Sequence, residues 1–104
     1  VLPDSGGPDV RHVFHQYTVR VTDDAAIGRD ALAAALSDRG IGTGIYYPRA
    51  AYDYECYRTH PDVVVEPMPN AELAAAQVLS LPVHPYLGAD DIDRIGDELH
   101  SLLR

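Results

Sequence analysis

Tyrosine is concentrated in one short segment of the sequence, around a single arginine. Five of the seven tyrosines lie within twelve residues, at positions 46, 47, 52, 54 and 57. A tyrosine side chain offers a flat apolar face with one polar tip, which suits sugars, rings and interfaces. Arg49 adds a rigid fork of donors that matches a carboxylate or a phosphate. The segment predicts either a core-packing cluster or a binding surface. In the second case, the candidates for a substrate pocket or a subunit contact are Tyr46, Tyr47, Arg49 and Tyr52.

Among the histidines, His15 most invites a functional interpretation, because it stands beside Gln16 and Tyr17 in a predicted strand. The alternative is a buried histidine whose ring nitrogens are satisfied by hydrogen bonds, and the sequence leaves both open. The five histidines show no metal-ligand spacing. Cys56 has no neighbour that would activate a thiol, so we expect a small buried hydrophobic residue there.

The glycines at positions 40, 42 and 44 resemble a phosphate-binding loop only in composition. Such a loop needs a strand, then glycines, then a helix whose N-terminus points at the anion. Here the predicted order is helix, glycines, strand, so Gly40 is better explained as the residue that ends the helix. The acid pairs 23–24 and 90–91 precede predicted helices, where they complement the helix dipole.

Hydrophobic periodicity predicts the elements that must position these residues. In the first strand, residues 13, 15, 17, 19 and 21 face the core. The loop 59–68 is expected to touch the core through residues 63–65. The last helix carries one apolar stripe made by Ile92, Ile95, Leu99, Leu102 and Leu103. The expected strands and extended pieces are 12–21, 41–47 and 80–85, and the expected helices are 29–40, a short one within 50–58, 71–79 with Asn70 as N-cap, and 90–104.

This order predicts an α+β domain, with a small, mainly antiparallel sheet and helices packed on one face. Residues 1–11 are rich in proline and glycine, so we expect a linker from an upstream domain there and the folded domain in 12–104. The first residue is Val1 and the only methionine is Met68, which leads us to expect a piece of a longer protein.

Composition excludes several classes of function. All eight basic residues are arginine against sixteen acids, giving a net charge of −8, which argues against nucleic-acid and anionic-membrane partners. No apolar run is long enough for a membrane helix. One cysteine excludes an internal disulfide and fits a cytoplasmic protein. Without lysine, the chain cannot form a Schiff base to a carbonyl cofactor.

Three segments taken together resemble one known family. HVFHQYTVRV, RDALAAALSDRGIGTGIYYP and AELAAAQVLSLPVHPYL, followed by a DIDRI helix, are similar to the C-terminal domain of DegT/DnrJ/StrS aminotransferases. The resemblance implies a homodimeric enzyme that uses pyridoxal phosphate (PLP) to move an amino group, usually from glutamate, onto a nucleotide-linked keto sugar. It also implies that a lysine of the larger N-terminal domain holds PLP. The small domain would close over the site and shape the substrate pocket.

One departure from the family pattern falls at the tyrosine segment. Where the family commonly reads YP-x-P-L-H, this sequence has Tyr47-Pro48-Arg49-Ala50-Ala51-Tyr52, so that Tyr52 takes the usual histidine position. On this interpretation the isolated chain binds no cofactor and does not transaminate. The alternatives are a stand-alone, non-catalytic module that binds through residues 46–57, and a regulatory subunit that completes the site of a separate lysine-bearing chain.

Overall fold

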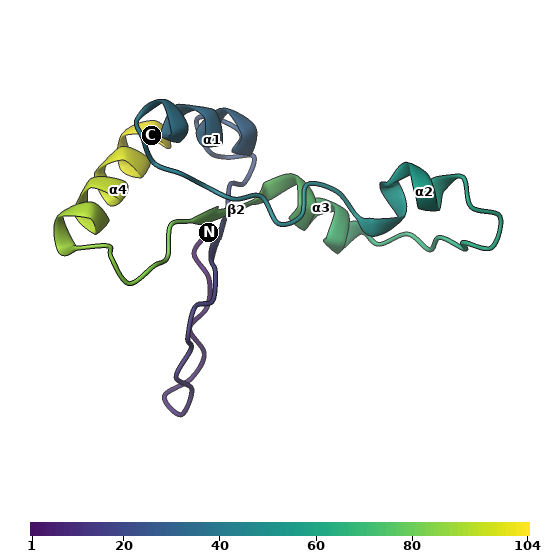
Figure 1. Cartoon of the computed structure of the whole chain (residues 1–104), viewed down its shortest axis with the longest axis horizontal. Helices are drawn as coiled ribbons and strands as arrows, with labels where there is room; N and C mark the ends of the chain where they lie inside the picture. Colours follow the sequence, from purple (N-terminus) through teal and green to yellow (C-terminus); the bar gives the residue numbers. More distant parts are fainter.

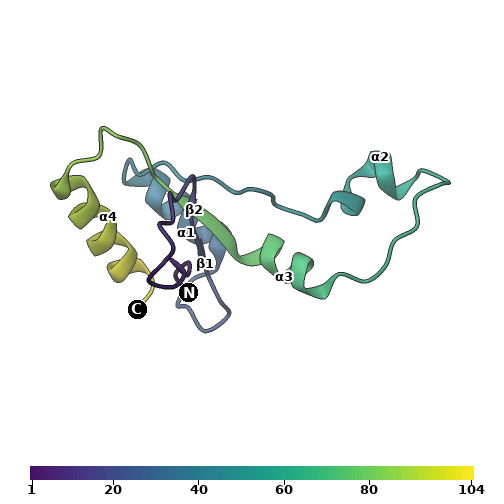
Figure 2. The same cartoon turned by 90° about the horizontal axis from the view of Figure 1, so that it is seen from below.

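The computed structural model describes all residues 1–104 and divides into a body and two projections (Figure 1). The body contains both strands together with α1 and α4, while α2 lies at the far end of a long projection that α3 joins to the body (Figures 1 and 2). The radius of gyration is 16.3 Å, against about 13 Å for a compact domain of this length. The elements are β1 (Tyr17–Arg20), α1 (Arg29–Asp38), the 3₁₀ helix η1 (Ala51–Asp53), α2 (Glu55–Arg58), α3 (Pro69–Gln77), β2 (Val78–Leu81) and α4 (Ala89–Leu102).

The sheet is small and antiparallel. β1 pairs with β2 in the register Thr18 opposite Ser80. On the outer edge of β2, Gly44 and Ser80 exchange two backbone hydrogen bonds, of 2.9 and 2.7 Å. On the outer edge of β1, Val1 and Arg20 exchange another two, of 2.7 and 2.9 Å. Each short strand therefore pairs with one additional residue on its outer edge, β2 with Gly44 and β1 with Val1.

The hydrophobic core lies between this sheet and two helices on one face of it. Leu32 and Leu36 of α1 and Leu79 of β2 are completely buried. The other buried apolar residues are Val19, Val21 and Ile41, and α4 packs against the cluster through Ile95, Leu99, Leu102 and Leu103. This arrangement confirms the predicted α+β class with helices on one face.

Local chemistry explains where the helices stop and start. Gly40 has φ +74°, a left-handed conformation that glycine adopts without strain, and it ends α1 as the sequence predicts. At the start of α4, the Asp91 carboxylate accepts the backbone N–H of Gly88 at 2.9 Å. Asn70, however, is not the N-cap of α3, because the helix already begins at Pro69. Proline is tolerated there because the backbone N–H groups of the first turn have no acceptor within the helix.

The predicted strands are longer than the observed ones. The first was expected over residues 12–21, yet Phe14 has φ +43°, and its N–H donates to His12 Nδ1 at 2.9 Å. This turn breaks the extended chain before Tyr17, so Val13 is 83% exposed instead of facing the core. The second predicted strand, 41–47, pairs with β2 only at Gly44.

The start of β2 and the segment after α2 also differ from expectation. β2 begins at Val78, two residues before the predicted extended piece, and takes the end of the predicted helix 71–79. Val64 is 90% exposed, so residues 63–65 do not touch the core as predicted, because the projection carries them away from the body.

Candidate functional site

A polar depression of about 400 Å³ opens beside the end of β2. The sequence brings its polar side chains from three places: His15 and Gln16 before β1, Thr43 and Tyr46 after α1, and Ser80 in β2. The other residues that line it are glycines and apolar residues, namely Gly42, Gly44, Leu81, Pro82 and Val83. An imidazole, an amide, a hydroxyl and a phenol thus surround one cavity, a set that can hydrogen-bond a hydroxylated ligand.

Ser80 fixes the geometry of this depression. The Ser80 hydroxyl oxygen lies 2.8 Å from the Thr18 hydroxyl oxygen. The backbone N–H and carbonyl oxygen of Ser80 are both hydrogen-bonded to the backbone of Gly44. The ring of Tyr46 lies directly against Gly44, where a Cβ atom would overlap it. A glycine is therefore required at position 44 for the tyrosine ring to occupy this place.

Gly44→Ala is expected to displace the Tyr46 ring from its place in the depression, because the added Cβ would overlap the end of the ring. Since Tyr46 is 53% exposed and can rotate away, the free energy of unfolding should change by less than about 1 kcal/mol. The backbone at Gly44 is held in place, because both its N–H and its carbonyl oxygen are hydrogen-bonded to Ser80. Ring-proton chemical shifts and nuclear Overhauser contacts of Tyr46 would show the displacement. Gly42→Ala is the matched control, since its added methyl group meets no atom within 4 Å. Equal spectra for the two variants would contradict the expected overlap.

The other three candidates of the tyrosine segment lie outside the depression. Tyr47 is 72% exposed, and its ring meets that of Tyr46 edge-on at 6.3 Å. The Arg49 guanidinium lies 5.6 Å from the centre of the Tyr54 ring. Tyr52 donates to Glu72 Oε1 of α3 at 2.5 Å. The structure therefore unites Tyr46 with His15 and separates both from Tyr47, Arg49 and Tyr52.

The bond to Glu72 also changes the acidity of Tyr52. It raises the pKa of the phenol to about 12, because the hydroxyl proton is shared with the carboxylate. Partial desolvation and the negative charges of Glu72 and Asp53 act in the same direction. The hydroxyl of Tyr52 therefore remains a donor throughout the neutral range.

Two predictions about individual side chains are wrong. His15 is exposed, so it is not the buried, internally satisfied histidine of the structural alternative. Cys56 is exposed instead of being buried, because α2 lies in the projection, away from the core. No three side chains of the histidine, cysteine, aspartate and glutamate types converge to form a metal site. No helix is both long and apolar enough to cross a membrane.

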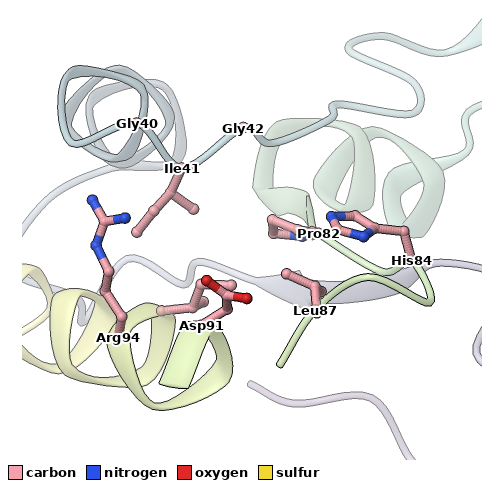
Figure 3. Close-up of a pocket in the computed structure, with 9 residues that line it drawn as sticks. Gly40, Ile41, Gly42, Pro82, His84, Leu87, Asp91 and Arg94 are labelled. Atoms are coloured by element: carbon pink, nitrogen blue, oxygen red, sulfur yellow. The ribbon is translucent and has the colours of Figure 1, made fainter. Parts of the chain in front are cut away.

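The glycine loop after α1 borders a second, smaller depression of about 330 Å³ (Figure 3). Arg94 of α4 rises toward Gly40, Asp91 stays close to the start of its own helix, and His84 lies on the opposite side (Figure 3). Arg94 donates to the backbone oxygen of Arg39 at 2.5 Å, at the carbonyl end of α1. The loop therefore follows the C-terminal end of α1, whereas a phosphate loop precedes the N-terminus of a helix.

An apolar groove of about 580 Å³ runs between the end of β2 and α4, and sequence reasoning did not single it out. Ile92, which the predicted stripe placed in the core, is 59% exposed and lines this groove. The other apolar lining residues are Leu2, Tyr17, Leu81, Pro82, Val83, Leu87, Ile95 and Leu99. The signal in the sequence was the width of the α4 stripe: Ile92 lines only the groove, while Ile95 and Leu99 line the groove and also pack against the core.

Comparison with known proteins supplies the context for these surfaces. The model of the DegT/DnrJ/EryC1/StrS aminotransferase family matches residues 1–100. DesV from S. venezuelae, solved in complex with a ketimine intermediate, is 34% identical with a TM-score of 0.74, over 91% of this chain and 24% of that one. DesI, solved in the presence of its TDP-sugar product, is 33% identical with a TM-score of 0.73, over 83% of this chain and 21% of that one. TlmJ from Streptoalloteichus hindustanus is 27% identical with a TM-score of 0.80, over 99% of this chain and 26% of that one. The chain therefore spans about a quarter of the length of the proteins it matches.

Proposed function

Since this chain belongs to the DegT/DnrJ/EryC1/StrS aminotransferase family, we propose that it acts as the C-terminal domain of a PLP-dependent sugar aminotransferase. The enzyme would transfer an amino group from glutamate to a keto sugar linked to a nucleotide. The observation that carries this proposal is the match to DesI, whose structure was solved with its TDP-sugar product. This chain covers only about a quarter of the length of each relative, which supports the proposal that further domains complete the enzyme.

The residues of this chain do not fit PLP as a covalent cofactor. Attachment of PLP to an enzyme requires the amine of a lysine, and all eight basic side chains here are arginines. The proposal therefore assigns the cofactor to a lysine of an N-terminal domain, and no chemical step to this chain alone.

The polar depression is the part of this chain best suited to substrate. The phenol face of Tyr46 offers a platform for a sugar ring, and the hydroxyl groups of Tyr46 and Thr43 offer hydrogen bonds to its hydroxyls. The His15 imidazole adds a group that can donate or accept. Tyr47 and Arg49 are proposed to extend this surface or to meet the second subunit of a homodimer.

The apolar groove is the part best suited to the remaining domain. The groove exposes apolar side chains of separate segments, among them Ile92 and Leu2, side by side. Burial against an N-terminal PLP domain would remove it from water. The proposed protein is cytoplasmic, as its single cysteine favours, and takes neither nucleic acid nor membrane as a partner.

Purified 104-residue chain is expected to show no transamination when supplied with PLP, glutamate and a TDP-linked keto sugar, because it lacks a lysine. In its source cells, an antibody raised against this domain should detect a product several times heavier than 11.3 kDa, and that product should carry PLP. Turnover by the 104-residue chain would contradict the proposal. A native product near 11.3 kDa would instead support the stand-alone binding module.

A further inference from the structure

The projection has very few ties to the body of the domain. We define the arm as residues 48–67, which contain η1 and α2 and extend away from the sheet in both views (Figures 1 and 2). The backbone hydrogen bonds within it are local, such as those from Tyr57 and Arg58 to the Tyr54 carbonyl at 2.9 and 3.0 Å. The cation–π contact between Arg49 and Tyr54 also stays inside the arm.

One side-chain hydrogen bond joins the arm to α3, from the Tyr52 hydroxyl to Glu72 Oε1 at 2.5 Å. Neither of the two salt bridges involves an arm residue. Glu72 lies in the first turn of α3, and α3 continues directly into β2. The bond therefore connects the arm to the element on which Ser80 and the polar depression are built.

We propose that Tyr52 and Glu72 form a latch that sets the orientation of the arm relative to the sheet. Tyr52 is then a positioning residue that acts through Glu72, and its hydroxyl is not free to contact a ligand. The proposal concerns the fold of this chain and does not rest on the proposed enzymatic function.

The short elements of the arm make this latch measurable. An isolated helix of four residues is unstable in water. The protection of the α2 amides from hydrogen exchange therefore depends on the hydrogen bond that attaches the arm to α3. Hydrogen–deuterium exchange of the amides of residues 57–60 reports on that protection. Loss of one hydrogen bond of this kind should raise their exchange rates roughly two- to tenfold.

The experiment compares four variants of the protein by exchange and mass spectrometry. Tyr52→Phe and Glu72→Ala should each raise exchange at residues 57–60, and the double variant should raise it no further, because both changes remove the same bond. Glu72→Gln keeps an accepting oxygen and should restore most of the protection. The unfolding midpoint and the exchange of the Ile41 and Ser80 amides in the body should stay unchanged.

Tyr57→Phe is the matched control, because it removes a hydroxyl from the same arm and that hydroxyl makes no hydrogen bond. Exchange rates for Tyr52→Phe equal to those of the wild-type protein would overturn the proposal. So would additive effects in the double variant, or a Glu72→Gln variant as unprotected as Glu72→Ala.

Discussion

Replacing Leu36 with alanine is expected to lower the free energy of unfolding by about 2–5 kcal/mol. Leu36 is completely buried on α1 and belongs to the core cluster to which the sheet and α4 also contribute. The core is a close-packed cluster of six buried apolar residues, so its neighbours can fill the cavity that the substitution leaves only in part. The loss is a large part of the stability of an ordinary domain, and a substantial unfolded population should result.

Urea denaturation followed by circular dichroism measures this loss. Leu73→Ala is the matched control, since Leu73 also lies in a helix, α3, but is 45% exposed. It should cost less than about 1 kcal/mol. Similar losses for the two variants would mean that the core does not lie where the structure places it.

Arg29→Ala is expected to produce the second large loss, of about 1–3 kcal/mol. The Arg29 guanidinium donates from one nitrogen to the carbonyl oxygens of Ala75 at 3.0 Å and Val78 at 3.1 Å. These carbonyls belong to the end of α3 and the start of β2, where the helix leaves its last acceptors without an internal donor. The side chain of Arg29 is only 9% exposed, so water cannot readily replace it.

A second contact of Arg29 provides the control. Its Nε also donates to Asp30, whose side chain is 81% exposed, and a surface pair of this kind contributes little. Asp30→Ala should therefore cost less than about 1 kcal/mol in the same urea titration. If the two variants lost equal stability, the ion pair and not the junction of α3 with β2 would be the source of the effect.

The helices were predictable because their signals are local. Leu32 and Leu36 recur at helical spacing, and Gly40 ends the helix through a conformation that its own backbone permits. The alternation of Val19 and Val21 likewise predicted the inward face of β1. The strand lengths were not predictable, since Phe14 leaves the extended conformation in a turn with His12, and nothing in the strand-like composition of residues 12–16 signals it.

The candidate site was predictable only in part. His15 and Tyr46 were singled out for different reasons, and what unites them is the pairing of β1 with β2 and of Ser80 with Gly44. Tyr52 was grouped with its neighbours in the sequence, although its partner is Glu72, on another helix. Contacts between distant elements depend on the tertiary arrangement, which periodicity and composition do not specify.

The pairing of β1 with β2 also governs when this domain can fold during its synthesis. Thr18 and Ser80 are 62 residues apart, and the arm lies between them in the sequence. When β1 emerges from the ribosome, its partner strand β2 and the helix α4 that packs against the core have not yet been synthesised. α1 can form early, but until β2 and α4 are made its leucines lack Leu79 and the α4 side chains that complete the core. The nascent chain must therefore keep β1 unpaired until nearly all of the domain has emerged, which leaves a strand edge open to other chains throughout translation.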